Sequence, residues 1–84
     1  MKTDKFQALK LIFAEGDHGE QAYRVIEGSV EISIQRDGQK LILAILGAGE
    51  TFGEMAMIES RPRSATARAL EPTTIEVIER QDFQ

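Results

Sequence analysis

One acid and one arginine, nine positions apart, could together bind a charged ligand. Glu54 follows Gly53, and Arg63 follows Pro62 and precedes Ser64. A phosphate is held by a guanidinium fork together with backbone N–H donors, and a ribose hydroxyl is held by a carboxylate acceptor. The pair therefore suits a small ligand that carries a phosphate and a sugar hydroxyl. On spacing alone, the alternative is two solvated surface residues beside a plain loop at Pro62.

The sequence around this pair resembles the phosphate-binding cassette of cyclic nucleotide-binding domains. Residues 52–69 read FGEMAMIESRPRSATARA, and the family pattern is F-G-E-hydrophobic-A-hydrophobic, a short variable stretch, then P-R-x-A-T/S. Residues 16–32, GDHGEQAYRVIEGSVEI, resemble a second segment of the same family. Together the resemblance covers about residues 8 to 83, so it applies to nearly the whole chain.

The resemblance implies a role for each polar residue of the cassette. Arg63 would pair with the exocyclic phosphate, and Glu54 would accept a hydrogen bond from the ribose 2′-hydroxyl. Arg61 is the competing arginine, but the family pattern places the binding arginine directly after the proline. Gly53 would let the backbone approach the sugar closely. The backbone N–H groups expected to bond the phosphate oxygens are those of Met55, Ala56 and Ala65, although ordinary helix propensity also explains Ala56.

Ser64 bears on the choice of base. In the resembled family this position tends to be Ala in eukaryotic cAMP binders, Thr in many cGMP binders and Ser in some bacterial cAMP receptors. A serine hydroxyl can donate to the phosphate or to a guanine edge, so cAMP is the expected ligand and cGMP stays open. Alignment to the family places the base against Ile32, Ala44 and Leu46, each of which could equally be a plain core residue.

Hydrophobic residues recur with a period of two through most of the chain, which is typical of β-strands. The pattern predicts strands at residues 9–13, 22–26, 30–35, 40–46, 65–69 and 74–78. Asp37-Gly38 predicts a hairpin turn, and the mostly apolar strand after it is expected to be covered on both faces. The one clear internal helix candidate runs from Gly53 to Ile58. Short strands separated by turns indicate an all-β sandwich or barrel.

The resemblance makes the fold class more specific: a double-stranded β-helix or jelly-roll barrel with one short helix in the cassette. The family usually carries a helix before the barrel and two after it. We expect these flanking helices to be largely absent from the single domain at residues 1–84, with Asp82 at the start of the first C-terminal helix. Apolar surface that such helices normally cover is then expected near Leu9, Leu11, Phe83 and the cassette, which predicts a homodimer or an exchange of helices between chains.

Composition narrows the class of protein. The formal net charge is −4, there is no cysteine, and His18 is the single histidine. We therefore expect no disulfide, no metal site, no catalytic residue and no cofactor other than the bound nucleotide. A DNA-binding surface would normally be basic, so no nucleic acid is expected to bind to this chain alone. The longest apolar run, Leu41 to Leu46, is too short to span a bilayer, and a cytoplasmic location is the default expectation.

The function indicated by these features is a cyclic nucleotide-binding regulatory module, a sensor rather than an enzyme. Two alternatives stay open. One is a domain of the same fold that no longer binds nucleotide and acts as a structural or interaction module. The other is the sensor fragment of a transcription regulator whose DNA-binding part lies outside this sequence.

Overall fold

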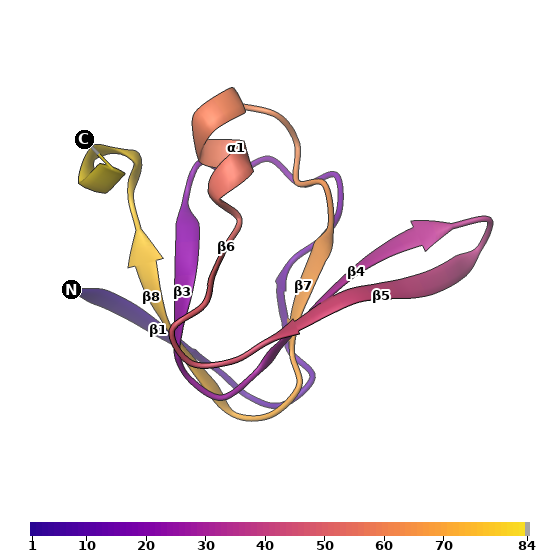
Figure 1. Cartoon of the computed structure of the whole chain (residues 1–84), viewed down its shortest axis with the longest axis horizontal. Helices are drawn as coiled ribbons and strands as arrows, with labels where there is room; N and C mark the ends of the chain where they lie inside the picture. Colours follow the sequence, from indigo (N-terminus) through magenta and orange to yellow (C-terminus); the bar gives the residue numbers. More distant parts are fainter. Residues whose placement is uncertain (84) are drawn as a thin grey trace.

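The computed structural model describes residues 1–83 and the side chains of residues 1–82, so the predicted exposed apolar surface at Phe83 lies outside the described side chains. The described residues form eight strands and two short helices (Figure 1). These are β1 (Lys2–Phe6), β2 (Leu11–Phe13), β3 (Ala22–Glu27), β4 (Val30–Arg36), β5 (Gln39–Leu46), β6 (Thr51–Phe52), α1 (Glu54–Glu59), β7 (Thr66–Ala69), β8 (Thr73–Ile78) and the 3-10 helix η1 (Arg80–Phe83).

The strands make two antiparallel sheets of four strands each (Figure 1). One has the order β1-β8-β3-β6 and the other the order β2-β7-β4-β5. Every strand pair is antiparallel, and most neighbours in a sheet are distant in sequence. This arrangement confirms the predicted all-β roll with one short α-helix, which joins β6 of the first sheet to β7 of the second.

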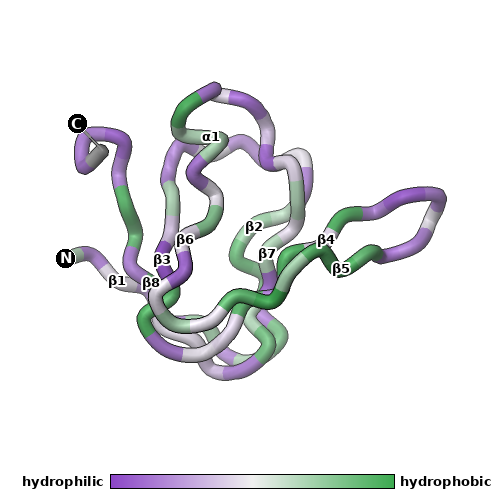
Figure 2. The backbone as a smooth tube through the Cα atoms, viewed as in Figure 1, coloured by the Kyte–Doolittle hydropathy of each residue, from purple (hydrophilic) through white to green (hydrophobic). Residues whose placement is uncertain are grey.

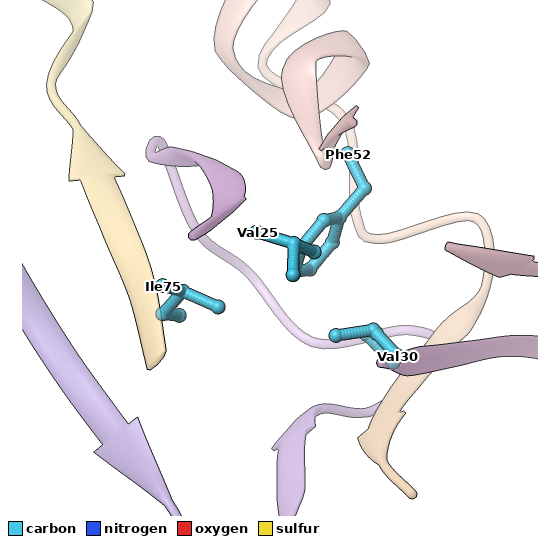
Figure 3. Packing of buried hydrophobic residues seen from close by; sticks show 5 residues of the cluster. Val25, Val30, Phe52 and Ile75 are labelled. Carbon is cyan, nitrogen blue, oxygen red and sulfur yellow. The ribbon is translucent and has the colours of Figure 1, made fainter. Parts of the chain in front are cut away.

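The hydrophobic core lies between the two sheets (Figure 3). Val25 of β3, Val30 of β4 and Ile75 of β8 are fully buried, and Phe52 of β6 closes the cluster with Ala67 of β7. Burial of one such aliphatic side chain contributes about 1.5–3 kcal/mol before the entropy cost of folding. The alternation along β7 and β8 sends every second residue into this core, which is why a period of two located these strands.

The predicted hairpin turn is confirmed. Asp37 and Gly38 have φ values of 55° and 76°, as a two-residue turn between right-twisted strands requires. β1 was not predicted. Its residues are mostly polar and exposed, and it pairs with β8 at the edge of the sheet. It is held through its backbone, so no hydrophobic alternation marks it in the sequence.

The prediction that residues 40–46 are covered on both faces is wrong. Leu41, Ile42, Leu43 and Ile45 are all exposed, Ile45 by 59%. β5 is an edge strand that pairs with β4 alone, and the β4–β5 hairpin extends away from the body (Figures 1 and 2). A continuous apolar run in a sequence is typical of a strand that is buried on both faces. Whether a strand lies at the edge of a sheet depends on the topology, which the run itself does not report. The homodimer stays a prediction, and β5 adds exposed apolar area to the surface that would drive it.

Glu15 connects the loop between β2 and β3 to strands β7 and β4 through hydrogen bonds. Its backbone N–H donates to Thr66 Oγ1 at 2.9 Å. Its carboxylate accepts from the backbone N–H of Gln35 and from the Arg36 guanidinium, both at 3.0 Å. The Gln35 N–H has the larger effect and the Arg36 guanidinium the smaller one, and together they hold the pKa of Glu15 below its usual value of 4.5.

A substitution of Glu15 therefore has a pH-dependent effect on stability. A pKa lowered by folding means that the charged carboxylate stabilises the fold above pH 4.5 and that this contribution is lost as the pH falls through the folded pKa. Glu15→Gln is expected to lower Tm at neutral pH, and the difference from the native chain should shrink in acid. Glu27→Gln is the control, because Glu27 makes no side-chain hydrogen bond or ion pair within residues 1–83. An equal Tm difference on both sides of pH 4.5 would contradict this account.

Candidate ligand-binding site

A cavity of about 360 Å³ opens between β6, α1 and the segment that leads into β7. Its wall contains Arg63, which is predicted to bind the phosphate, Glu54, which is predicted to bind the ribose hydroxyl, and residues of the short helix α1. The lining residues are Phe13, Ile32, Thr51, Phe52, Gly53, Glu54, Met55, Ala56, Glu59, Arg61, Pro62, Arg63, Ser64 and Ala65. All seven predicted ligand-binding residues of the cassette are therefore brought together around one space.

Only one of the three predicted base-pocket residues lines this cavity. Ile32 of β4 does so, whereas Ala44 and Leu46 of β5 do not. β5 lies beyond β4 from β7, one strand farther from the cassette. Leu46 instead packs against the hydrophobic core. In place of these two residues, the aromatic rings of Phe13 and Phe52 contribute the apolar part of the wall.

Arg63 is the most deeply buried charged residue of the site, with only 5% of its surface exposed. Nη1 donates to the backbone carbonyl of Gly53 at 2.9 Å, and Nη2 donates to the carbonyl of Gln21 at 2.9 Å. Two of the five guanidinium N–H donors are thus engaged. The guanidinium is fixed between the start of the cassette and the end of the loop that precedes β3.

Two aromatic rings lie against the same guanidinium. Its central carbon is 4.3 Å from the centre of the Phe13 ring and 5.6 Å from that of Tyr23. The centroids of the Phe13 and Tyr23 rings are 5.9 Å apart, and the rings are stacked. The centroid of the Phe52 ring lies 6.0 Å from that of Phe13 and 5.4 Å from that of Tyr23. Aromatic faces attract a cation, most strongly where water is excluded. The charge is therefore compensated by carbonyl dipoles and ring faces.

No carboxylate lies within ion-pair distance of Arg63 among residues 1–83, although six ion pairs occur elsewhere in that part of the chain. A buried charge is normally paired, because desolvation is expensive. Arg61 shows the contrast. Its side chain is mostly exposed, and its Nε lies 3.6 Å from Oε2 of Glu59. Arg61 also lines the cavity, so its role as the solvated arginine of the two stays a prediction.

The backbone of Arg63 joins the two segments that carry the family resemblance. Its N–H donates to the carbonyl of Asp17 at 2.7 Å, and its carbonyl accepts from the N–H of Gly16 at 2.8 Å. The segment after α1 and the loop between β2 and β3 lie side by side at the same end of the molecule (Figure 1). The glycine-rich loop is therefore the support of the cassette arginine.

The start of α1 brings Glu54 and several backbone N–H groups to the cavity. Gly53 caps the helix with φ 79°, a left-handed conformation that glycine adopts without strain, and no side chain caps the first turn. The first N–H groups of a helix have no partner within the helix. Glu54 is half-buried, Met55 is exposed and Ala56 is buried. This end of the cavity therefore offers both a carboxylate acceptor and unpaired donors.

The opposite end of α1 is held by a residue that follows β8. Nη2 of Arg80 donates to the carbonyl of Met57 at 2.8 Å and to Ser60 Oγ at 3.0 Å. The last carbonyls of a helix lack partners within it, and a cation near them is favourable. Arg80 thereby connects the short cassette helix to the chain that follows β8.

Burial also shifts the ionisation of Tyr23, whose ring lies beside the guanidinium and does not line the cavity. Desolvation raises the pKa of its phenol above 10, and the nearby charge of Arg63 opposes this shift. The phenol oxygen donates to Gln21 Oε1 at 3.2 Å. Tyr23 is the one tyrosine of the chain, and there is no tryptophan, so its ultraviolet absorbance reports on this site alone.

Sequence reasoning did not predict the contacts of Phe13, Tyr23, Gly19 and Gln21 with Arg63. Tyr23 and Gly19 belong to the segment that resembles the family, so the resemblance marked them without giving their partner. They lie about forty positions or more from Arg63 in the chain. Neither hydrophobic period nor motif spacing reports contacts at that separation, and only the pairing of the sheets brings them together.

Known proteins share the sequence pattern and the fold of this chain. The family model described as the cyclic nucleotide-binding domain matches residues 3–84. The chain belongs to this family. It is 41% identical over 75 residues to the cyclic AMP receptor protein of Thermus thermophilus, a match that covers 88% of this chain and 35% of that protein. It is 32% identical over 83 residues to a cAMP-dependent protein kinase regulatory subunit of Debaryomyces hansenii, which covers 99% of this chain and 18% of that protein.

A solved structure is similar to this chain in both fold and sequence. The EAL enzyme Bd1971 in its cAMP-bound form has a TM-score of 0.92 and 40% identity over 96% of this chain and 22% of that one. Its cGMP-bound form has the same TM-score and identity. This chain spans about a third or less of the length of the two curated relatives.

Within residues 1–83, no three His, Cys, Asp or Glu side chains are grouped so that they could hold a metal ion. The helices of the same range include none that combines the length and the hydropathy of a membrane span.

The tight packing around Arg63 makes Gly19 sensitive to substitution. A Cβ at this position would lie 2.7 Å from Nη2 of Arg63. Gly19→Ala should therefore displace the guanidinium from its carbonyl partners and cost about 1–3 kcal/mol of unfolding free energy. Gly47→Ala is the matched control, because nothing lies within 4 Å of its Cβ position and neither glycine has a positive φ.

Urea denaturation of both alanine variants measures this difference. Gly47→Ala is expected to be neutral or to add up to about 1 kcal/mol, since alanine restricts the unfolded chain. Equal stabilities of the two variants would show that the guanidinium is not held as described.

Proposed function

We propose that this chain binds a cyclic nucleotide, with the cyclic phosphate on Arg63 and the ribose 2′-hydroxyl on Glu54. Bound in this way, the ligand would fill the cavity between β6, α1 and the segment before β7. The domain would act as a regulatory module, in which capture of the nucleotide shifts the equilibrium between two conformations of the protein that contains it.

The observation that carries this proposal is the buried charge of Arg63. The guanidinium lies in the wall of a cavity, is 5% exposed and has no carboxylate partner within residues 1–83. Three of its N–H donors are unengaged there. A planar fork that presents several donors and a positive charge with no carboxylate beside it suits a phosphate better than a neutral ligand.

The other cassette residues support the same ligand. Glu54 lies at the cavity beside the left-handed Gly53, where a sugar hydroxyl could approach the carboxylate. The N–H groups of Met55, Ala56 and Ala65 belong to residues that line the same space. A ligand with an anionic group and a neighbouring hydroxyl therefore matches both ends of the site.

For the base, we propose that cAMP binds in preference to cGMP. The support is Ser64 at the cavity wall and the names of the relatives, a cyclic AMP receptor protein and a cAMP-dependent kinase regulatory subunit. The base would pack against Ile32 and the aromatic wall, with Ala44 and Leu46 behind them on β5. The related EAL enzyme has been solved with either nucleotide, so a preference and not an exclusive choice is expected.

We infer a binding role and not a catalytic one for this domain. The relatives named above are a receptor and a regulatory subunit, although the related EAL enzyme shows that such a domain also occurs within enzymes. The activity that the domain regulates is carried by sequence beyond the part that these proteins share with the chain. A transcription regulator and a protein kinase are both consistent with the matches.

Replacement of Arg63 tests the phosphate contact. Arg63→Met keeps an apolar stem in the site and removes the guanidinium, so cAMP affinity should fall by about 10- to 100-fold, as expected for a charge-assisted bond. Arg24→Met is the matched control, because Arg24 pairs with Glu76 on the surface and does not line the cavity. Isothermal titration with cAMP and with cGMP gives the affinities and the base preference.

Two results would contradict the proposal. If Arg63→Met and Arg24→Met bind cAMP equally well, the phosphate is held elsewhere. If the native chain binds neither nucleotide, the alternative of an interaction module without nucleotide binding is supported.

Removal of one ligand hydroxyl tests the ribose contact. The native chain is expected to bind 2′-deoxy-cAMP about 10-fold more weakly than cAMP, because the Glu54 carboxylate then loses a charge-assisted bond. Glu54→Ala should bind both nucleotides with similar affinity. Discrimination that persists in Glu54→Ala would show that another group holds the 2′-hydroxyl.

A further inference from the structure

We propose that Phe13 and Tyr23 are positioning residues of this site, whose rings hold the Arg63 guanidinium at the cavity wall without neutralising its charge. The proposal rests on the proposed function, because it assigns the reason why Arg63 is ready to bind an anion. Neither ring belongs to the cassette. Phe13 is on β2 and Tyr23 is on β3, which lie in different sheets.

Four groups contact the guanidinium. The Gly53 and Gln21 carbonyls each accept from one terminal nitrogen at 2.9 Å. The Phe13 ring covers the central carbon at 4.3 Å, and the Tyr23 ring lies at 5.6 Å. The carbonyls fix the position of the fork, and the rings oppose its rotation out of the wall. The orientation of the remaining donors is thereby set before a ligand arrives, which lowers the cost of ordering the site.

Neutral rings stabilise the buried cation and leave its N–H donors free, which a carboxylate could not do. A carboxylate beside Arg63 would compensate the buried charge but would compete with an incoming phosphate for the same donors. The quadrupole of an aromatic ring stabilises a desolvated cation from its face and occupies no N–H donor. The arginine can then stay buried while it keeps its full charge for an anion.

The alternative reading is that both rings are ordinary core residues. Phe13, Tyr23 and Phe52 do form one aromatic cluster, and all three pack against the core. Leucine would fill most of that volume but would supply no ring face. Substitution by leucine therefore separates the two roles, provided that an equivalent loss of packing elsewhere serves as a reference.

Phe6 supplies that reference. It is a partly buried phenylalanine on β1 that packs against the same core and does not line the cavity. The comparison uses the whole chain with Phe13→Leu, Tyr23→Phe, Tyr23→Leu and Phe6→Leu, each titrated with cAMP and each melted. Tyr23→Phe keeps the ring and removes the phenol hydroxyl, which donates to Gln21.

We expect Phe13→Leu to weaken cAMP binding by roughly 3- to 30-fold, in line with a desolvated cation–π contact. Tyr23→Leu should weaken it less, because its ring is farther from the guanidinium, and Tyr23→Phe should bind as the native chain does. Phe6→Leu should lower Tm to a similar extent and leave the affinity unchanged.

A second readout needs no ligand. The phenolate absorbance of Tyr23 gives the pKa of the one tyrosine, which the positive charge of Arg63 lowers. Arg63→Met should therefore raise this pKa further. Phe13→Leu should move it in the same direction if the ring holds the guanidinium near Tyr23, whereas a mere loss of packing, as in Phe6→Leu, should not.

The results separate this proposal from the proposed function. Equal loss of affinity in Phe13→Leu and Phe6→Leu, or a Tyr23 pKa that is unchanged in Phe13→Leu, would overturn the positioning role. If the native chain binds no cyclic nucleotide, the proposed function fails, and the phenol titration still decides whether Phe13 holds Arg63.

Discussion

The buried guanidinium of Arg63 is the constraint on which the rest of the site depends. Only 5% of Arg63 is exposed, no carboxylate among the described residues pairs with it, and two backbone carbonyls and two ring faces compensate its charge. Such a group tolerates little change around it. The absence of a Cβ at Gly19 and Gly53 follows directly, because side chains at these positions would lie within 2.7 and 2.9 Å of the terminal nitrogens.

Two segments that are separate in the sequence, both of which carry the family resemblance, meet in the fold. β3 and β7 belong to different sheets, yet the loop before β3 and the segment before β7 lie at the same end of the roll. There the backbone of Arg63 pairs with Gly16 and Asp17. The glycine-rich loop is thus required for the position of the arginine and not only for the turn that it makes.

The parts of the fold that the sequence could predict are those with a local cause. Alternation located β7 and β8, whose inward residues are buried, and Asp37-Gly38 defined its turn through the φ values it needs. β1 and the exposure of β5 could not be predicted in this way, because both depend on which strand is at an edge. The cassette residues were found by resemblance, whereas Phe13 reaches Arg63 only through the pairing of distant strands.

A buried cation without a counter-ion also bears on the choice between a binding domain and a structural module. Desolvation of a buried charge opposes folding. The two carbonyl bonds and the two ring contacts of Arg63 offset this cost, and the predicted penalty of Gly19→Ala depends on them. A barrel that served only as a scaffold would have no need to desolvate a charge beside a cavity. Sites of binding are where such a cost is expected, and here the cost falls on the one side chain that presents a positive charge to the cavity from a buried position.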